Sequence, residues 1–268
     1  MNIQAYASVK RFTCWLYATL LCLIIVLGTS AGVKADESDA RRILKAMSDF
    51  MAAQQSISFD FDAILEVVTT EEQKLSLASS GSLVLSRPDK IRVTRTGGFA
   101  DIEMFFDGKI LTLLGKNLNL YSQIDLPGTL DNLVNELHET YNRPLPAADL
   151  LLSSPYEDLM TGVIDIKDLG SGVIGGVECD YLAFRTDEVD WQIWIGQGDQ
   201  PYPYRYVITS KGVSGSPDYA IQTRNWKRGS AVAAEFSFTN SSKAKMVDLK
   251  ELKGSGDLPD NFMKGETK

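Results

Sequence analysis

The sequence predicts an α+β fold in which a large, one-sided antiparallel sheet is covered by a few helices. Three observations predict it. Several stretches alternate between apolar and polar residues with a period of two, which is typical of strands that bury one face. Short turns separate these stretches, and only two regions show the 3.6-residue period of helices.

The first 35 residues have the order of a secretory signal peptide. Lys10 and Arg11 precede an apolar run over residues 12–28, and Val33-Lys34-Ala35 forms a small-x-small site. We therefore expect export, cleavage after Ala35 and no integral membrane segment in the mature chain. The alternative is an uncleaved signal anchor.

Length and charge limit the class of protein. Residues 36–252 suit a single domain, and a tail rich in Gly, Lys and Asp follows over residues 253–268. Removal of residues 1–35 takes away three basic residues and no acidic ones, so the formal charge moves from −8 to about −11. An acidic surface argues against nucleic-acid binding, which requires clustered Lys and Arg.

The elements follow from the two periods. Segment 37–54 predicts a helix with Ile43, Leu44, Met47, Phe50 and Met51 on one face. Residues 57–67 then alternate, with apolar residues at every odd position, and predict a long strand. Further strands are predicted by the apolar positions Leu83 and Leu85; Ile91 and Val93; Ile102, Met104 and Phe106; Val189, Trp191, Ile193 and Ile195; Tyr204, Tyr206 and Ile208; and Phe236 and Phe238.

Strands in direct succession predict an antiparallel meander whose apolar face needs a cover. The cover is limited to the N-terminal helix and the stretch 129–160, where Pro144, Pro146 and Pro155 divide the helical period into two or three short pieces. A hollow between sheet and helices, or a fully packed core, is compatible with this pattern.

Catalytic and metal-binding motifs are not found in the sequence, so we expect no enzyme and no cofactor. The single histidine, His138, lies beside a helical stripe between glutamates and is expected at the surface. Cys179, the one cysteine outside the signal peptide, is expected to be a small buried side chain. Glu178, Asp180, Asp187 and Asp190 could attract a basic partner or a divalent cation, although a solvated acidic face is the commoner explanation.

Several short motifs resemble known families. Residues 81–92 (GSLVLSRPDKIR), 106–111 (FDGKIL) and 233–240 (AAEFSFTN) are similar to the LolA/LolB lipoprotein-carrier superfamily. Residues 179–184 (CDYLAF), 190–195 (DWQIWI) and Pro203 more closely resemble an uncharacterised family of predicted bacterial periplasmic proteins with a LolA-like fold. The resemblance covers roughly residues 38–250.

The resemblance implies a periplasmic protein with an unclosed antiparallel β-barrel, helices at its mouth and an apolar cavity. In the lipoprotein carriers, the arginine of the Arg-Pro turn governs lid closure, and the matching residue here is Arg87. Its strand parity with Leu83 and Leu85 also points it toward the apolar side. Asn240-Ser241 replaces the usual prolines after Phe238, and the CDY and DWQ motifs are absent from the carriers, so the identity of the cargo does not transfer.

The function expected is binding or transport of a hydrophobic ligand (a lipid, an acyl chain or a lipidated protein) without catalysis. The alternative is an envelope interaction or scaffold module that meets a protein partner transiently and carries no lipid. The expected ligand-binding residues are Phe59, Phe61, Leu65, Leu83, Leu85, Arg87, Met104, Phe106, Trp191 and Ile193. For each apolar one, simple core packing is the competing interpretation.

Overall fold

The structure is a computed structural model that describes residues 37–98, 101–141, 145, 147–229 and 235–252. The predicted signal peptide, its cleavage site and the predicted tail lie outside these residues.

Twelve strands form one sheet in the order β12-β6-β5-β4-β3-β2-β1-β11-β10-β9-β8-β7. The strands are β1 (Ser56–Val68), β2 (Lys74–Ser86), β3 (Lys90–Gly97), β4 (Asp101–Phe106), β5 (Ile110–Gly115), β6 (Leu120–Asp125), β7 (Asp165–Ile174), β8 (Val177–Arg185), β9 (Val189–Gly196), β10 (Pro203–Ser210), β11 (Asp218–Arg228) and β12 (Lys245–Met246). Neighbours are antiparallel except β12 and β6, which run parallel. The sheet consists of two meanders joined where β1 pairs with β11, so the predicted α+β class and unclosed antiparallel sheet are confirmed.

The long central strand β1 shows why the sheet has one apolar face. Ile57, Phe59, Phe61 and Ala63 are buried, while the intervening serine and aspartates face the other side. Phe61 lies opposite Gly81 of β2. A Cβ atom at Gly81 would lie 2.5 Å from the Phe61 ring and 2.0 Å from the Thr94 carbonyl oxygen, so the close approach of these strands requires glycine.

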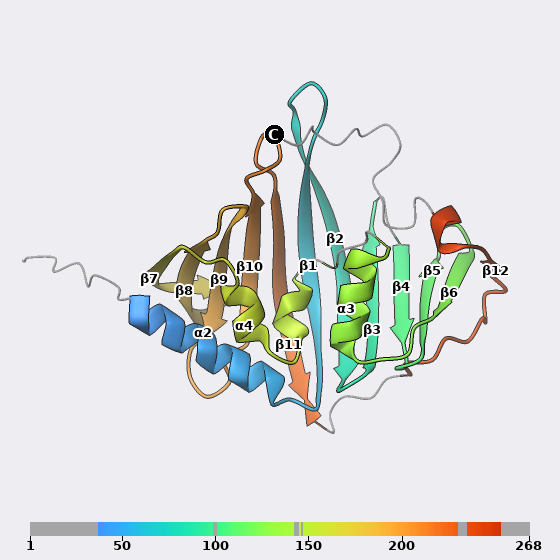
Figure 1. Cartoon of the computed structure of the whole chain (residues 1–268), viewed down its shortest axis with the longest axis horizontal. Helices are drawn as coiled ribbons and strands as arrows, with labels where there is room; N and C mark the ends of the chain where they lie inside the picture. Colours follow the sequence, from blue (N-terminus) through green and yellow to red (C-terminus); the bar gives the residue numbers. More distant parts are fainter. Residues whose placement is uncertain (1–36, 99–100, 142–144, 146, 230–234, 253–268) are drawn as a thin grey trace, which may run out of the picture. The chain divides into compact units, whose positions relative to one another are not determined.

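The apolar face is covered by helices from two parts of the chain (Figure 1). They are α2 (Glu37–Ala52), α3 (Leu130–Glu139), the 3-10 helix η2 (Ala148–Leu151) and α4 (Pro155–Met160). The predicted face of α2 is confirmed, because Leu44, Met47 and Met51 are fully buried and Ile43 and Phe50 pack against the core. We call these four helices the cover. Together with the sheet face they enclose one apolar cluster.

The prediction of a final strand at Phe236 and Phe238 is wrong, because these residues lie in irregular chain. Phe238 instead packs its ring against Phe105 and Tyr121, with centroids 5.6 and 5.0 Å away. The alternation around Phe238 therefore comes from packing onto the sheet and not from strand pairing. The chain then forms the two-residue strand β12 and a last 3-10 helix, η4 (Leu249–Glu251), beside β6.

We predict that Gly81→Ala lowers the free energy of unfolding by about 2 kcal/mol or more, because the new methyl group overlaps backbone as well as the Phe61 ring. Urea denaturation measures this. Gly98→Ala is the matched control, since a Cβ atom there meets nothing within 4 Å. Equal stability of the two variants would contradict the close approach described for β1, β2 and β3.

Candidate ligand-binding site

The structure brings most of the expected ligand-binding residues together, but as packed core. Eight of them are at most 7% exposed and belong to the cluster between sheet and cover: Phe59, Phe61, Leu83, Leu85, Met104, Phe106, Trp191 and Ile193. Leu65 is half-buried in the outer part of the β1–β2 hairpin and lies outside this cluster. These eight residues therefore form part of one packed cluster that also includes side chains of the cover.

Arg87 lies at the junction between the sheet and two helices of the cover. Its backbone N–H donates to the Gln55 carbonyl at 2.8 Å, and its Nη2 lies 3.5 Å from the carbonyl oxygen of Met51 at the end of α2. Its Nε is buried without a partner. Burial lowers the pKa of the guanidinium, and the charge of Asp131 on α3 partly opposes this. The side chain thus points toward the apolar side, as its strand parity predicts.

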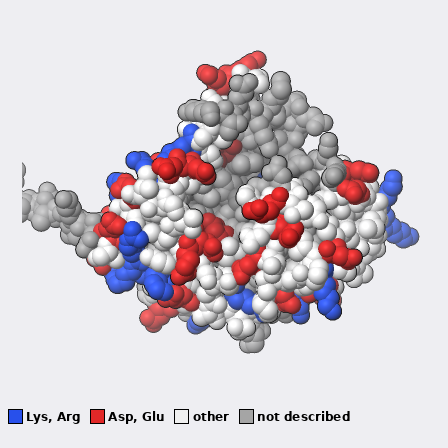
Figure 2. Space-filling view, viewed as in Figure 1, with Lys and Arg blue, Asp and Glu red and all other residues white. Residues whose placement is uncertain are grey.

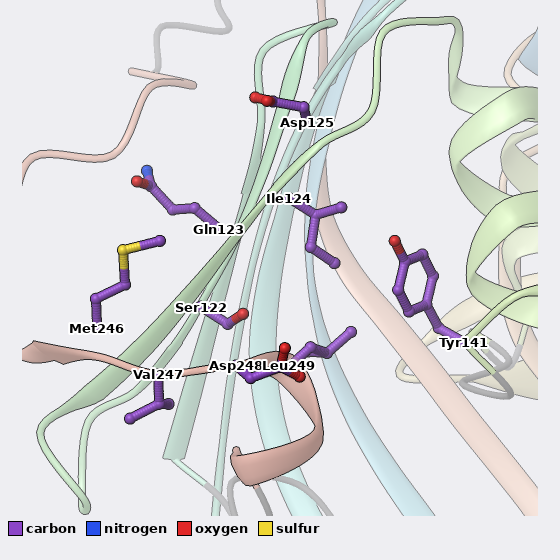
Figure 3. A pocket seen from close by; sticks show the side chains of 9 residues that line it. All are labelled: Ser122, Gln123, Ile124, Asp125, Tyr141, Met246, Val247, Asp248 and Leu249. Atoms are coloured by element: carbon purple, nitrogen blue, oxygen red, sulfur yellow. The ribbon is translucent and has the colours of Figure 1, made fainter.

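A hollow of about 690 Å³ opens beside β6, where the cover ends (Figure 3). It lies between three parts of the chain: the strand β6, Tyr141 after α3, and the segment that runs from β12 into η4. The lining residues are Ser122, Gln123, Ile124, Asp125, Tyr141, Met246, Val247, Asp248 and Leu249. Ile124 and Tyr141 also pack against the core cluster, so the floor of the hollow is continuous with the apolar interior.

A smaller hollow of about 270 Å³ adjoins the first and shares Asp125 and Tyr141 with it. Its other lining residues are Leu126, Pro127, Asn132 and Glu136. Among the described residues that line the two hollows, three are acidic (Asp125, Glu136 and Asp248) and none is basic. Figure 2 shows further acidic side chains over the middle of the face that carries the helices. The rim is therefore negatively charged above a partly apolar floor.

One polar contact ties the cover to the sheet within the core. The Tyr206 hydroxyl on β10 donates to Asp149 of η2 at 3.1 Å, and the Leu150 N–H donates to the other carboxylate oxygen at 3.2 Å. Burial of the carboxyl group raises the pKa of Asp149, and the hydrogen bond from Tyr206 opposes this only in part. The ionised form of Asp149 is thus disfavoured in the closed structure.

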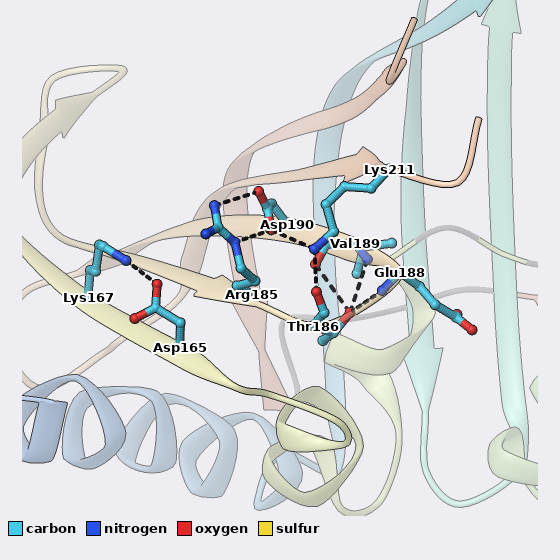
Figure 4. A network of polar contacts seen from close by, with 8 residues as sticks. All are labelled: Asp165, Lys167, Arg185, Thr186, Glu188, Val189, Asp190 and Lys211. Atoms are coloured by element: carbon cyan, nitrogen blue, oxygen red, sulfur yellow. Dashed lines mark hydrogen bonds and ion pairs between the residues drawn. The ribbon is translucent and has the colours of Figure 1, made fainter. Parts of the chain in front are cut away.

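The acidic residues around Trp191 do not form a free cation site (Figure 4). Asp190 is bound by Arg185 at 2.9 Å and by Lys211 at 3.3 Å, and these contacts, that of Arg185 first, lower its pKa. Asp180 accepts a hydrogen bond from Gln197 at 2.8 Å. Across the described part of the chain, no three Asp, Glu, His or Cys side chains come together as a metal site. The protein's own cations thus already occupy Asp190.

His138 and Cys179 lie where the sequence predicts them. The His138 side chain is 65% exposed and lies 3.8 Å from Glu139. Cys179 is fully buried, and burial raises the pKa of its thiol to about 11. Neither residue has the surroundings of an activated nucleophile or base.

The helices in the described part of the chain are too short or too polar to span a membrane.

Residues 40–250 match the sequence profile of a family described as predicted periplasmic protein (DUF2092). The chain belongs to this family. That match confirms the family suspected from the CDYLAF and DWQIWI motifs. No curated protein sequence matches the chain significantly.

Solved structures with related arrangements include proteins from three bacteria. An uncharacterised conserved protein from Thermus thermophilus is 12% identical, with 78% of this chain and 99% of that chain covered and a TM-score of 0.44. The Mycobacterium tuberculosis lipoprotein LppX is 12% identical, with 75% of this chain and 100% of that chain covered and a TM-score of 0.43. A LolA superfamily protein from Nitrosomonas europaea is 9% identical, with 74% of this chain and 97% of that chain covered and a TM-score of 0.36. Likenesses with such low TM-scores establish no shared ligand.

None of the ten residues expected to bind ligand lines either hollow. Sequence reasoning missed the hollow because its walls come from segments far apart in the chain. One signal was present: Tyr141 ends the helical stripe before the prolines, which marks where the cover stops.

We predict that Asp149→Asn stabilises the closed protein at neutral pH. An acid whose pKa is raised in the folded state costs stability at pH values above its unfolded pKa, because only the unfolded state ionises freely there. The cost is absent at pH values below ~3.9, the ordinary aspartate pKa, where both states are protonated. Urea unfolding at neutral and at acidic pH measures the difference.

The control for Asp149→Asn is Asp125→Asn, which removes an exposed carboxylate at the rim of the hollow. The gain of Asp149→Asn should disappear at acidic pH. An equal gain at both pH values, or a loss at neutral pH, would show that burial of the Asp149 carboxyl group does not destabilise the fold.

We also predict that the Cys179 thiol is unreactive in the native mature chain. With no exposed surface and a pKa of about 11, it forms little thiolate at ordinary pH. Ellman's reagent should label it only after denaturation. Prompt labelling of the native protein would mean that β8 opens readily.

Proposed function

We propose that the protein binds a hydrophobic ligand, such as an acyl chain, in the hollow beside β6 and acts by binding and not by catalysis. One observation carries this proposal: a space of about 690 Å³ opens along β6, and its floor continues into the core through Ile124. Small-molecule sites in proteins are typically ~300–1,000 Å³ and lined mainly by apolar groups with a few polar ones.

Burial of methylene groups supplies the affinity. Each CH₂ removed from water contributes about 0.8 kcal/mol, so a chain of ordinary length needs no specific polar partner. Ile124, Val247 and Leu249 provide apolar wall, and the Tyr141 ring lies across from Ile124 (Figure 3). The acidic rim disfavours an anionic group near Asp125, so the carboxylate of a bound fatty acid would lie in solvent, away from this residue.

A longer ligand needs the cover to move, because Phe59, Leu83 and Trp191 are buried in the packed cluster between sheet and cover. Two observations support a movable cover. Ser48 Oγ on α2 and Arg87 Nε are buried without hydrogen-bond partners where helices meet the sheet. Each such group weakens the closed contact by roughly 1–3 kcal/mol. We propose that the expected ligand residues, with Arg87 at the junction of α2 and α3, come into contact with ligand in an opened state.

The proposed place of action is the periplasm. The family is described as predicted periplasmic, and the order of residues 1–35 is that of a signal peptide. The periplasm is an aqueous compartment between two membranes, and an apolar hollow there can shield the acyl chains of lipids and acylated molecules from water.

The first test is chemical. The mature protein is purified from the cell envelope, extracted with organic solvent and analysed by mass spectrometry for stoichiometric lipid. Protein that is free of lipid and does not bind a fluorescent fatty acid up to the probe's solubility would exclude this function and favour the envelope interaction module.

We predict that Met246→Glu weakens fluorescent fatty-acid binding about tenfold, which corresponds to roughly 1.4 kcal/mol. Met246 is 55% exposed and lines the hollow, so the change adds charge to the apolar wall without disturbing the core. The matched control is Val173→Glu on β7, at the other end of the sheet, where Val173 is 66% exposed. Equal affinities of the two variants would place the ligand elsewhere.

A further inference from the structure

Strand β6 has an open edge beside the hollow. Among the described residues its partner on that side is β12, which pairs at two positions, Lys245 with Leu120 and Met246 with Tyr121. The last bond of this ladder runs from the Val247 N–H to the Tyr121 carbonyl at 2.9 Å. The chain then turns into η4, so within the described part of the chain no strand follows β6 from Ser122 to Asp125 on this side.

The register shows which backbone groups of β6 face this open side. The Leu126 N–H donates to the Lys109 carbonyl at 2.7 Å, so Leu126 and Lys109 form a hydrogen-bonded pair across β5 and β6. Hydrogen-bonded pairs alternate in an antiparallel ladder, which places the N–H and C=O groups of Gln123 and Asp125 on the side away from β5. Tyr121, at the same parity, already uses this side to bind β12.

The opposite edge of the sheet, formed by β7, does not have a regular hydrogen-bond ladder. Strand β7 carries an irregularity between Asp168 and Ser171, with Gly170 at a φ of +82°, and this interrupts its ladder. Bulges and charged side chains are common means of blocking an edge strand. The ladder of β6 with β5 has no register shift from Leu120 to Asp125. The strand ladder is thus interrupted at the β7 edge and regular at the β6 edge.

Side chains define what an added strand would meet. Ser122, Gln123, Ile124 and Asp125 all line the hollow. Ser122 and Ile124 point to the covered face, whereas Gln123 and Asp125 have the opposite parity. In Figure 3 the side chains of Gln123 and Ile124 leave β6 in opposite directions. An added strand would therefore place alternate residues over Ile124 and Tyr141, and the residues between them on the side of Asp125.

We propose that the edge of β6 from Ser122 to Asp125 binds an extended segment of a partner polypeptide by strand addition. The partner's chemistry follows from the two sides: apolar residues alternate with Lys or Arg, because the exposed Asp125 lies on one side and the described lining includes no basic residue. The main-chain groups of Gln123 and Asp125 supply the hydrogen bonds. The main-chain hydrogen bonds distinguish this interaction from binding of the proposed lipid ligand, although both use the space over Ile124 and Tyr141.

The test uses a fluorescent peptide of about six residues with alternating Val and Lys, its binding to the mature protein being measured by fluorescence anisotropy at low salt. Gln123→Pro should weaken binding at least about tenfold, because it removes an N–H that faces the open side and leaves the bonds to β5 intact. Gln123→Ala is the matched control. It loses the same side-chain bond to Thr112 but keeps the N–H, and it should bind like the wild type.

Two further measurements keep the outcome interpretable. Circular dichroism and thermal unfolding compare the folding of the Pro and Ala variants. A peptide N-methylated on alternate residues should lose binding to the wild-type protein, whatever the Pro variant does. A Val/Glu peptide should bind at least about tenfold more weakly than the Val/Lys peptide, because Asp125 repels it.

The proposal is overturned if the wild type does not bind the Val/Lys peptide, if N-methylation leaves affinity unchanged, if the folded Pro variant binds like the Ala control, or if the Val/Glu peptide binds equally well. Fatty-acid binding is measured on the wild-type protein only, because Gln123 lines the hollow. Binding of the Val/Lys peptide that is lost on N-methylation and in the Pro variant supports strand addition at β6. Retained peptide binding in a protein that carries no lipid overturns only the proposed function.

Discussion

The apolar face of the sheet is the constraint on which the rest of the structure depends. Twelve strands expose more apolar surface on one side than their own side chains can shield, and each Å² left in water costs about 25 cal/mol. The chain meets this requirement with helices drawn from two separate regions, α2 before the first strand and α3, η2 and α4 between the two meanders. The cover stops short of β6, and the hollow lies where it stops.

The contact between cover and sheet is not uniformly apolar. Ser48 and Arg87 each bury a polar atom that has no hydrogen-bond partner among the described residues, and burial raises the pKa of Asp149 although Tyr206 donates a hydrogen bond to it. A layer designed only for stability would place methyl groups at these positions. Their presence makes this contact less stable than a fully apolar one would be.

The strands were largely predictable because a period of two is local information. Ile57, Phe59 and Phe61 show the buried face of β1 within a few residues, and the same holds for Trp191 and Ile193 in β9. The pair Phe236 and Phe238 shows the limit: alternation predicts that one face packs against apolar groups, and it does not distinguish strand pairing from packing onto a sheet made by other residues.

The hollow was not predictable for a different reason. Ile124, Tyr141 and Leu249 are brought together by tertiary structure, and no local period relates them. The same applies to Asp190, whose partner Arg185 lies five residues away on the neighbouring strand β8, while Lys211 follows β10. The sequence identifies acidic residues, but only the register of the strands shows which of them already have partners.

The two edges of the sheet differ, and this difference matters because the sheet does not close. An unclosed sheet retains unpaired backbone groups at both ends, and these groups attract other strands unless they are blocked. In this protein β7 is interrupted at Gly170, whereas β6 is regular and only its first two residues are paired by β12. The regular edge lies beside the acidic rim and the end of the cover. Selection against aggregation alone would block both edges, so a β6 left regular beside a charged hollow is the arrangement expected of a surface that receives a specific segment.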